Sequence, residues 1–264
     1  MAGGPLALIE QEDRSTGVRV LRLNRPDRRN ALSGELVEAL LRAITQAEAD
    51  PEVRVIVLHG SGGTFCAGGD LAGGLGGTGG LVAAHQQRGV FGEVLVRLMK
   101  SPLVSIAAIE GDALGGGLGL AVACDVGIAA PAARFGTPEI KLGLFPWIIL
   151  AVLQRNVGRK ALMELVLTGS RVDAPRALEL GLITRVAEST DPLSEALSLA
   201  ETLAARAPIA LALGKQTFQA VADQPLDDAV RFLNTHLTLN LMTEDAMEGV
   251  AAFLQRREPS WKGR

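Results

Sequence analysis

The sequence predicts an α/β protein, and three observations support this fold class. Short runs of apolar and β-branched residues alternate with longer segments whose apolar residues recur at helical spacing. Glycine clusters directly follow two of the predicted strands, and from about residue 151 the pattern is almost entirely helical. With 264 residues, of which 48% are hydrophobic and 21% charged, the chain can also bury a sizeable core. Disordered, collagen-like and small disulfide-stapled proteins are therefore excluded.

The first predicted elements are a strand, a helix and a second strand. A strand pattern opens at Val18 and ends near Leu23, and the Pro and Asn of the next segment indicate a loop. Ser33 is a favourable N-cap for the following helix, which Asp50-Pro51 ends. A buried strand over 53–58 comes next, and this order implies a right-handed crossover. One face of the helix carries Leu36, Val37, Leu40, Leu41 and Ile44.

The alternation continues through the glycine-rich middle of the chain. A glycine-rich segment over 60–80 precedes a helical stretch around 92–100 and a strand over 103–109. Three consecutive glycines then lead into a short apolar helix over 116–124, and a strand follows over 126–129.

The last part of the chain is predicted to be helical, and Thr243-Glu244-Asp245 forms a good acidic helix start. Its helices are apolar on more than one face, which indicates a subunit interface. The residues responsible are Leu226, Val230, Phe232, Leu233, Leu237, Leu239 and Leu241.

Charge and cysteine content restrict the environment and the partners. The 26 Lys and Arg against 29 Asp and Glu give a net charge of −3, so we expect neither a nucleic acid nor a membrane as partner. Cys66 and Cys124 are too few for a disulfide framework. The N-terminus has no basic segment typical of a signal peptide, and the best apolar run, over 142–153, is far shorter than the ~20 residues of a membrane helix. We expect a cytoplasmic protein.

Most sequence motifs that carry chemistry are missing or misplaced. Residues 74–79 match GxGxxG, but they lie in a low-complexity run well after the preceding strand, so a mobile surface loop is favoured over a nucleotide site. No GxxxxGK[ST], GxSxG or HExxH occurs, which argues against a P-loop ATPase, an α/β-hydrolase and a zinc enzyme. No metal site is expected.

Two other glycine clusters follow predicted strands, over 64–70 and 111–117. Glycines at such turns let free backbone N–H groups approach a ligand. Two facing turns of this kind would form an oxyanion hole, which is often the largest single catalytic contribution. Tight packing of backbone against backbone explains the same spacing equally well.

Six ordered segments of the chain form a recognisable pattern. They are LNRPDRRNALS (23–33), GTFCAGGDL (63–71), AAIEGDALGGGLGLAVACDV (107–126), ARFGTPEIKLGLFP (133–146), LTGSRVDAPRALELGLITRV (167–186) and EGVAAFLQRREPSW (248–261). Through them the chain resembles the enoyl-CoA hydratase/isomerase (crotonase) family over essentially its whole length. The resemblance implies a crotonase-like spiral of ββα units over residues 1–205, with two roughly perpendicular sheets. It also implies a helical trimerisation region over 206–264, and a homotrimer or a homohexamer built from two trimers.

The resemblance also assigns candidate site residues. Its two oxyanion donors are the backbone N–H groups of Gly69 and Gly116. No prosthetic group is implied, because coenzyme A is part of the substrate thioester. The residues implied to hold coenzyme A are Arg28, Arg29, Ala67, Asp70 and Leu71, with Phe253 and Arg256 supplied by a neighbouring subunit. Guanidinium groups at positions 28 and 29 suit phosphate, although a solvated turn would look the same.

Only one of the two catalytic glutamates of the family's hydratases is present in this sequence. Two-carboxylate hydratases of this family hold a water between two glutamates, and here the first position is Gly119 while the second is Glu139. Apolar neighbours of Glu139 should desolvate its carboxyl and raise its pKa. We expect Glu139 to be the single acid/base. The family's dienoyl-CoA isomerases have further acidic residues at the positions that Gly119 and Trp147 occupy here, so that subclass is disfavoured.

Three functions remain open from the sequence. Hydration of a 2-enoyl-CoA is the first, Δ3-Δ2-enoyl-CoA isomerisation is the second, and a non-catalytic acyl-CoA-binding homologue is the third. The acyl chain length is not indicated. The acyl tail of the substrate is expected to pass the glycine-rich loop over 73–80 and the region of Trp147. The candidate lining residues are Leu81, Val82, Val90 and Phe91.

Overall fold

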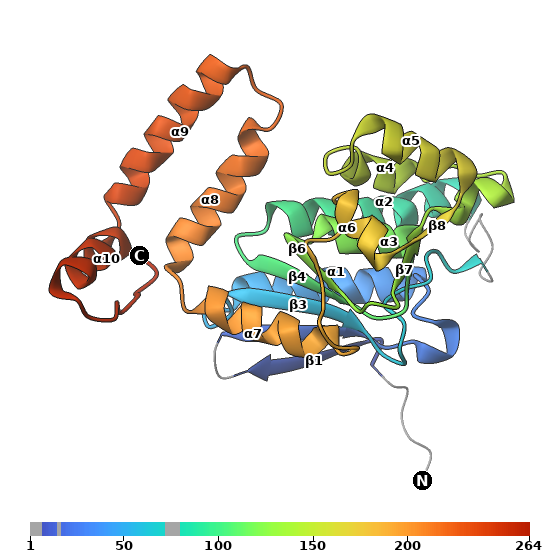
Figure 1. Cartoon of the computed structure of the whole chain (residues 1–264), viewed down its shortest axis with the longest axis horizontal. Helices are drawn as coiled ribbons and strands as arrows, with labels where there is room; N and C mark the ends of the chain where they lie inside the picture. The colour runs from blue at the N-terminus through green and yellow to red at the C-terminus, as the bar shows by residue number, and fades with distance from the viewer. Residues whose placement is uncertain (1–6, 15–16, 72–79) are drawn as a thin grey trace, which may run out of the picture.

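The computed structural model describes residues 7–14, 17–71 and 80–264, whose strands form two sheets (Figure 1). The six-stranded sheet has the order β1-β2-β3-β4-β6-β9, and the three-stranded sheet has the order β5-β7-β8. The pairs β1–β2 and β7–β8 are antiparallel, and the others are parallel. The strands are β1 (Ile9–Arg14), β2 (Val18–Leu23), β3 (Val55–Gly60), β4 (Val104–Ile109), β5 (Asp112–Leu114), β6 (Val126–Ala129), β7 (Arg134–Gly136), β8 (Arg171–Asp173) and β9 (Arg185–Val186).

Helices cover both faces of the large sheet. Successive residues of β3 alternate between two cores: Val55 packs toward α7 (Pro192–Ala204), and Ile56 packs toward α1 (Gly34–Ala49) and α2 (Gly80–Lys100). A strand buried on both faces reads as a continuous apolar run, which is why this strand is visible in the sequence. The side of α7 that meets the sheet is made of Ala196, Ala200 and Ala204, so the helix approaches closely.

The predicted alternation of strands and helices is confirmed for the first half of the chain. The Ser33 side chain accepts the N–H of Leu36 at 3.3 Å and caps α1 as expected. The short apolar helix after the three glycines is α3 (Gly116–Ala123), and β2 and β6 have their predicted bounds. The predicted helix around 92–100 is longer than expected, because α2 already begins at Gly80. The predicted loop over 73–80 lies outside the described residues except for Gly80.

Several short strands are absent from the sequence prediction. β5, β7 and β8 have three residues each and β9 has two, too few to show a period of two. β1 carries four charged residues among its six, so its sequence resembles a loop. It lies at the edge of the large sheet, where charged side chains are favoured because they discourage pairing with other chains.

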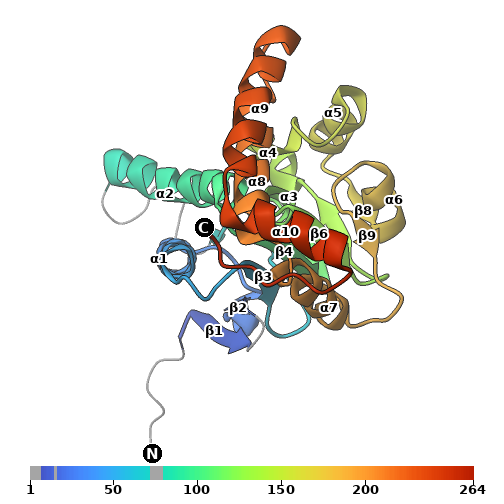
Figure 2. The same ribbon diagram turned by 90° about the vertical axis from the view of Figure 1, so that its left-hand side faces the viewer.

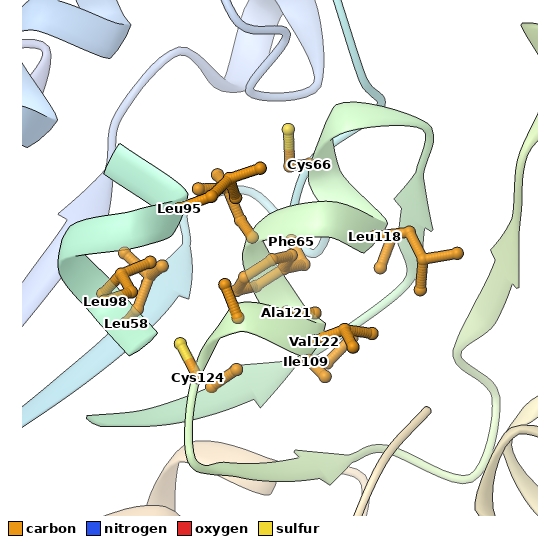
Figure 3. Packing of buried hydrophobic residues seen from close by; sticks show 14 of the residues in the cluster. Leu58, Phe65, Cys66, Leu95, Leu98, Ile109, Leu118, Ala121, Val122 and Cys124 are labelled. Atoms are coloured by element: carbon orange, nitrogen blue, oxygen red, sulfur yellow. The ribbon is translucent and has the colours of Figure 1, made fainter. Parts of the chain in front are cut away.

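The core beneath the small sheet is built from several elements that meet at Phe65. Figure 3 shows Phe65 surrounded by side chains from β3, β4, α2 and α3. Phe65 and Cys66 are fully buried, so the chain segment that follows β3 is anchored in the core. Burial raises the pKa of the Cys66 thiol to about 12, so Cys66 is an inert core residue despite its place beside a glycine turn.

The remaining helices complete the body and form a C-terminal arm. Figure 1 shows α9 and α10 set to one side of the sheets, with α8 joining them to the body, and in Figure 2, which faces that side, they lie in front of it. The boundary predicted after residue 205 stays a prediction. The remaining helices are the short helices η1 (Pro26–Arg28) and η3 (Pro138–Leu142), together with α4 (Trp147–Leu153), α5 (Arg159–Thr168), α6 (Ala174–Glu179), α8 (Pro208–Val221), α9 (Leu226–Leu241) and α10 (Glu244–Gln255).

A buried lysine fastens α8 to the body. Lys215 on α8 has a side chain only 8% exposed, and its Nζ lies 2.7 Å from the carboxylate of Asp125. The same Nζ donates to the carbonyl oxygens of Leu98 at 2.8 Å and Leu103 at 2.7 Å. Asp125 in turn accepts from the N–H and hydroxyl of Ser105. Removing one partner of such a buried pair leaves an uncompensated charge, so the network fixes the middle of α8 against the body.

The described residues contain neither a single helix that could span a membrane nor a group of side chains placed to hold a metal ion. No single helix there is long and apolar enough to cross a membrane, although α7 and α8, bent by 107°, meet the criterion together by length and composition alone. No group of three His, Cys, Asp or Glu side chains in those residues is placed to hold a metal ion.

Candidate active site

The two glycine turns lie side by side, joined by backbone hydrogen bonds. The N–H of Cys66 donates to the carbonyl oxygen of Asp112 at 2.9 Å, and the N–H of Leu114 donates to the carbonyl oxygen of Cys66 at 3.0 Å. A Cβ atom at Gly68 would lie 2.9 Å from the carbonyl oxygen of Leu114. The turn after β3 therefore continues the small sheet next to β5, and the turns face one another as an oxyanion hole requires.

Each turn presents one unused backbone N–H. Leu32 donates to the carbonyl oxygen of Gly68 at 2.8 Å and accepts the N–H of Asp70 at 3.1 Å, a parallel bridge that directs the amide of Gly69 away from Leu32. Gly116 is the first residue of α3, where a helical N–H has no partner within the helix. Neither amide has an acceptor within the described ranges. Gly69 is exposed and Gly116 is half-buried, so a ligand can reach both.

Glu139 lies against the second turn. A Cβ atom at Gly115 would lie 2.7 Å from Oε1 of Glu139, so the carboxyl group occupies the space that a side chain at Gly115 would need. Gly115 also has φ +50° and ψ −121°, a conformation that other residues avoid. Glycine at this position therefore allows both the turn and the close approach of the carboxyl group.

The surroundings of Glu139 are apolar and leave one of its oxygens without a partner. Oε2 is buried and has no hydrogen bond to any described residue. Burial raises the pKa of the Glu139 carboxyl, because desolvation disfavours its charged form, although a backbone hydrogen bond opposes this shift. An unsatisfied buried oxygen in an otherwise bonded protein indicates a functional group rather than a structural one.

The position of the missing carboxylate is filled by an isoleucine. A Cβ atom at Gly119 would overlap Cγ2 of Ile149 and lie 2.9 Å from its Cβ. Ile149 belongs to α4 and is 3% exposed, so it cannot move into solvent. The close contact between α3 and α4 thus requires glycine at position 119. Any larger side chain there must displace Ile149.

Aliphatic and aromatic side chains border the free amide of Gly116. A Cβ atom at Gly116 would lie 2.7 Å from Cδ1 of Leu32 and 3.4 Å from Cζ of Phe91. The rings of Phe145 and Trp147 are 5.0 Å apart, and Trp147 is 74% exposed. An acyl group bound at Gly116 would therefore meet hydrophobic walls. Of the candidate lining residues, the structure brings Phe91 next to Gly116, while Leu81 and Val82 are exposed on the first turn of α2.

Comparison with known proteins supplies the family. The family model for enoyl-CoA hydratase/isomerase matches residues 13–264. The chain belongs to the enoyl-CoA hydratase/isomerase family. It is 36% identical to 2,3-dehydroadipyl-CoA hydratase of Escherichia coli over 95% of the chain and 97% of that protein. An enoyl-CoA hydratase structure from Mycobacterium smegmatis has a TM-score of 0.90 at 34% identity, covering 96% of this chain and 98% of the other. One from Bacillus anthracis has a TM-score of 0.92 at 32% identity, covering 97% and 100%.

These likenesses confirm the predicted crotonase fold as well as the family. The fold places four of the predicted coenzyme A residues close together. The carbonyl oxygen of Arg29 accepts the N–H of Ala67 at 3.0 Å, and Arg28 directly precedes it with an exposed side chain. Asp70 forms an ion pair with Arg25 at 2.9 Å. This pair fixes the loop before α1 to the turn after β3, so the described contacts of Asp70 are structural.

Of the other predicted residues, Leu71 adjoins this group, whereas Phe253 and Arg256 lie apart from it. Leu71 is 52% exposed directly after Asp70. Phe253 is 82% exposed on α10, and Arg256 follows the end of that helix in a left-handed conformation. Figure 1 shows α10, which carries Phe253 and directly precedes Arg256, well apart from α3 and the small sheet of the same chain. Within one subunit the structure therefore does not bring them to the site.

Sequence reasoning missed three residues that shape the site. The sequence does not distinguish Gly115 from the neighbouring glycines of its cluster. In the structure, the absence of a side chain at Gly115 leaves the space that the carboxyl group of Glu139 occupies. Arg25 carries no signal, because its partner Asp70 is 45 residues away. Ile149 is likewise remote in sequence from Gly119. The apolar run over 142–153 was visible, but nothing in it indicates which side chain faces α3.

We predict that Gly119→Ala destabilises the protein by about 1–3 kcal/mol, because the added methyl group overlaps Ile149. Ile149→Ala alone should cost about 2–4 kcal/mol through the cavity it leaves. The double variant should be less destabilised than the sum of the two single variants, by at least ~1 kcal/mol. The smaller side chain at position 149 makes room for the methyl group at position 119, which in turn fills part of the cavity. Urea unfolding measures all three.

Gly89→Ala is the matched control, since a Cβ atom there meets nothing within 4 Å among the described residues. It lies in α2, where alanine is favoured over glycine by up to ~1 kcal/mol. Strict additivity of the two site changes would contradict the contact between position 119 and Ile149.

Proposed function

We propose that the protein acts on enoyl-CoA thioesters, with Glu139 as its only acid/base and the amides of Gly69 and Gly116 as the oxyanion hole. The observation that carries this proposal is the Glu139 carboxyl group set against the turn that presents the free amide of Gly116. Two amides aimed at one thioester oxygen stabilise the negative charge that develops there. The helix α3 adds its positive end at the same point.

Hydration of a 2-enoyl-CoA is the first reaction we propose. The water oxygen bonds to C3 while electrons move through C2 to the thioester oxygen held by the two amides. Glu139 takes one proton from that water and delivers a proton to C2, so the carboxylate is regenerated and one water is added. The name of the Escherichia coli relative, a hydratase, supports this choice.

Migration of a double bond is the second candidate, and Ile149 favours it. With Ile149 in contact with Gly119, α3 offers no second carboxylate to hold a water. Isomerisation of a 3-enoyl-CoA needs no water: Glu139 removes a proton from C2, the dienolate is held by the amides, and the proton returns at C4. One carboxylate suffices for both transfers.

We also propose that the C-terminal arm assembles the protein into a homotrimer or a homohexamer. Apolar side chains are exposed along α9 and α10 and between them, more than isolated surface residues would explain. The most exposed of these apolar side chains are Leu226, Val230, Leu237, Leu241, Met242, Met247, Val250, Phe253 and Leu254. Such an assembly would also supply Phe253 and Arg256 to a neighbouring site.

We expect the purified protein to convert crotonyl-CoA, 3-hexenoyl-CoA or both, measured by ultraviolet absorbance of the conjugated thioester and by product chromatography. Glu139→Gln should lower kcat by about 10²-fold or more, because the amide cannot accept the proton. Glu164→Gln, an exposed residue of α5, is the matched control and should be fully active. Coenzyme A binding without turnover of either substrate would show a binding protein instead, and full activity of Glu139→Gln would exclude the mechanism.

The raised pKa of Glu139 predicts opposite effects on activity and on stability. The carboxylate form accepts the first proton, so kcat/KM should rise with pH through the raised pKa. The free energy of unfolding should fall as the pH rises from the ordinary pKa of glutamate to the raised pKa of Glu139. Over that range Glu139 is ionised in the unfolded chain but still protonated in the folded protein. Glu139→Gln should therefore raise the melting temperature at pH 8 and leave it unchanged at pH 4, measured by calorimetry. An equal effect at both values would contradict the desolvated carboxyl.

Sedimentation equilibrium should give the mass of three or six chains. Leu237→Glu, on the exposed face of α9, should lower that mass because a charge is costly in an apolar interface. Arg231→Glu, an exposed residue of the same helix, is the comparison variant. A monomeric wild-type protein at micromolar concentration would contradict the proposed assembly.

A further inference from the structure

The peptide unit that carries the amide of Gly69 lies between two consecutive glycines. Residues Ala67, Gly68 and Gly69 have no side chain beyond Cβ, and a Cβ atom at Gly69 would meet no described atom within 4 Å. Gly68 also has φ +99°, a conformation open chiefly to glycine. No side chain of this segment can therefore anchor the peptide unit, and its orientation depends on backbone hydrogen bonds and on the residue that follows.

The backbone hydrogen bonds come from the loop before α1. The N–H of Ala67 donates to the carbonyl oxygen of Arg29 at 3.0 Å. The N–H of Leu32 donates at 2.8 Å to the carbonyl oxygen of Gly68, which belongs to the same peptide unit as the amide of Gly69. A trans peptide unit is planar, and its C=O and N–H groups point in opposite directions. The hydrogen bond at Gly68 thus aims the N–H of Gly69 at the side where the thioester oxygen is proposed to lie.

Asp70 supplies a side-chain anchor directly after Gly69. Its N–H donates to the carbonyl oxygen of Leu32 at 3.1 Å, and its Oδ2 lies 2.9 Å from Nη2 of Arg25. The side chains of Arg25 and Asp70 are only 19% and 16% exposed, so salt and water screen this ion pair less than one on the surface. Nη1 of Arg25 also donates to the carbonyl oxygen of Ala31 at 2.7 Å. A single planar guanidinium therefore joins the loop before α1 to the residue that follows Gly69.

Arg25 is itself held in place from the interior of the protein. Its N–H donates to Oδ1 of Asn30 at 2.9 Å. Nδ2 of Asn30 donates to the carbonyl oxygens of Ser61 at 2.9 Å and Thr64 at 2.6 Å. Asn30 is fully buried and has a left-handed backbone at φ +54°, a conformation that persists where surrounding contacts impose it. The segment between β3 and the first glycine turn thus fixes the position of Arg25.

We propose that Arg25 is a positioning residue of the oxyanion hole: through Asp70 it keeps the peptide unit between Gly68 and Gly69 from rotating away from the substrate. This inference rests on the proposed function, in which the amide of Gly69 binds the thioester oxygen. Without the guanidinium, the segment loses its charged anchor, and the conformational freedom of two glycines lets the peptide unit rotate. The N–H of Gly69 would then point at the substrate in only part of the molecules.

The absorption spectrum of a bound conjugated thioester, 2,4-hexadienoyl-CoA, tests this proposal. Hydrogen bonds to the carbonyl oxygen of this ligand draw electrons toward that oxygen and move its absorption maximum to longer wavelength. Spectra are recorded at saturation in a Glu139→Gln background, so that the thioester is not consumed. We expect a red shift on binding, and Arg25→Met should reduce it by at least half. The affinity for coenzyme A, measured by isothermal titration calorimetry, should stay the same.

Kinetics with Glu139 intact give a second measurement. Arg25→Met should lower kcat about tenfold with little change in KM, which is part of the roughly 10²–10³-fold lost when an oxyanion donor is removed outright. Arg25→Lys keeps the charge but not the planar fork, so its kcat should lie between those of the wild type and Arg25→Met. Adding Asp70→Asn to Arg25→Met should cause no further loss, because both changes break the same pair.

Arg97→Met is the matched control. It removes the partly buried ion pair between Arg97 on α2 and Glu48 on α1, whose Nε and Oε2 atoms are 3.3 Å apart. Its red shift and kcat should equal those of the protein with Arg97.

The outcomes separate this inference from the proposed function. An unchanged red shift in a folded Arg25→Met variant overturns the inference and leaves the proposed function intact. An equal loss in Arg97→Met, or a loss matched by weaker coenzyme A binding, also overturns it, because Arg25 would then act on stability or on binding. If Arg25→Met does not fold, Arg25→Gln replaces it and should show the same loss, since a neutral amide forms no ion pair with Asp70. No red shift in the Glu139→Gln background despite binding removes the proposed oxyanion hole and this inference with it.

Discussion

The pairing of the segment after β3 with β5 is the interaction on which the site depends. Phe65 donates to the carbonyl oxygen of Glu110 at 2.7 Å, and Cys66 continues the pairing with β5. The side chains of Phe65 and Cys66 are fully buried, so hydrophobic packing holds this short ladder from beneath. Because the ladder is fixed, the free amides of Gly69 and Gly116 are held close together without a ligand. Donors that are already oriented need little reorganisation when charge develops on a bound oxygen.

The apolar environment of Glu139 destabilises the folded protein and at the same time raises the pKa of the carboxyl group. Leaving Oε2 buried without a partner opposes folding when the carboxyl is ionised. The same desolvation brings the pKa of the group closer to neutral pH, where an acid/base works best. Ile149 takes the space that a second polar group would need and keeps this side of α3 apolar. In the proposed mechanism the site thus relies on one carboxyl group with a raised pKa instead of on a pair of carboxylates.

The sequence could predict what is local or carried by family resemblance, and little else. Ser33 and Thr243 cap their helices as expected, because capping depends on a few neighbouring residues. The candidate roles of Gly69 and Glu139 came from motifs. The contact of Ile149 with Gly119 and the ion pair of Arg25 with Asp70 could not be predicted, since each joins segments that only the tertiary fold brings together. The three-residue strands β5, β7 and β8 are too short to show a periodic pattern.

The buried lysine on α8 has a consequence for how assembly and catalysis are related. Lys215 holds the end of α2 through Leu98 and the approach to β4 through Leu103, and its partner Asp125 directly follows the segment that ends α3. These are the elements that carry Phe91, the turn into β5 and the free amide of Gly116. One ammonium group therefore joins α8 to three segments that lead to the candidate active site. In the proposed assembly, a displacement of α8 by a neighbouring subunit would therefore be felt directly at the end of α2, before β4 and after α3.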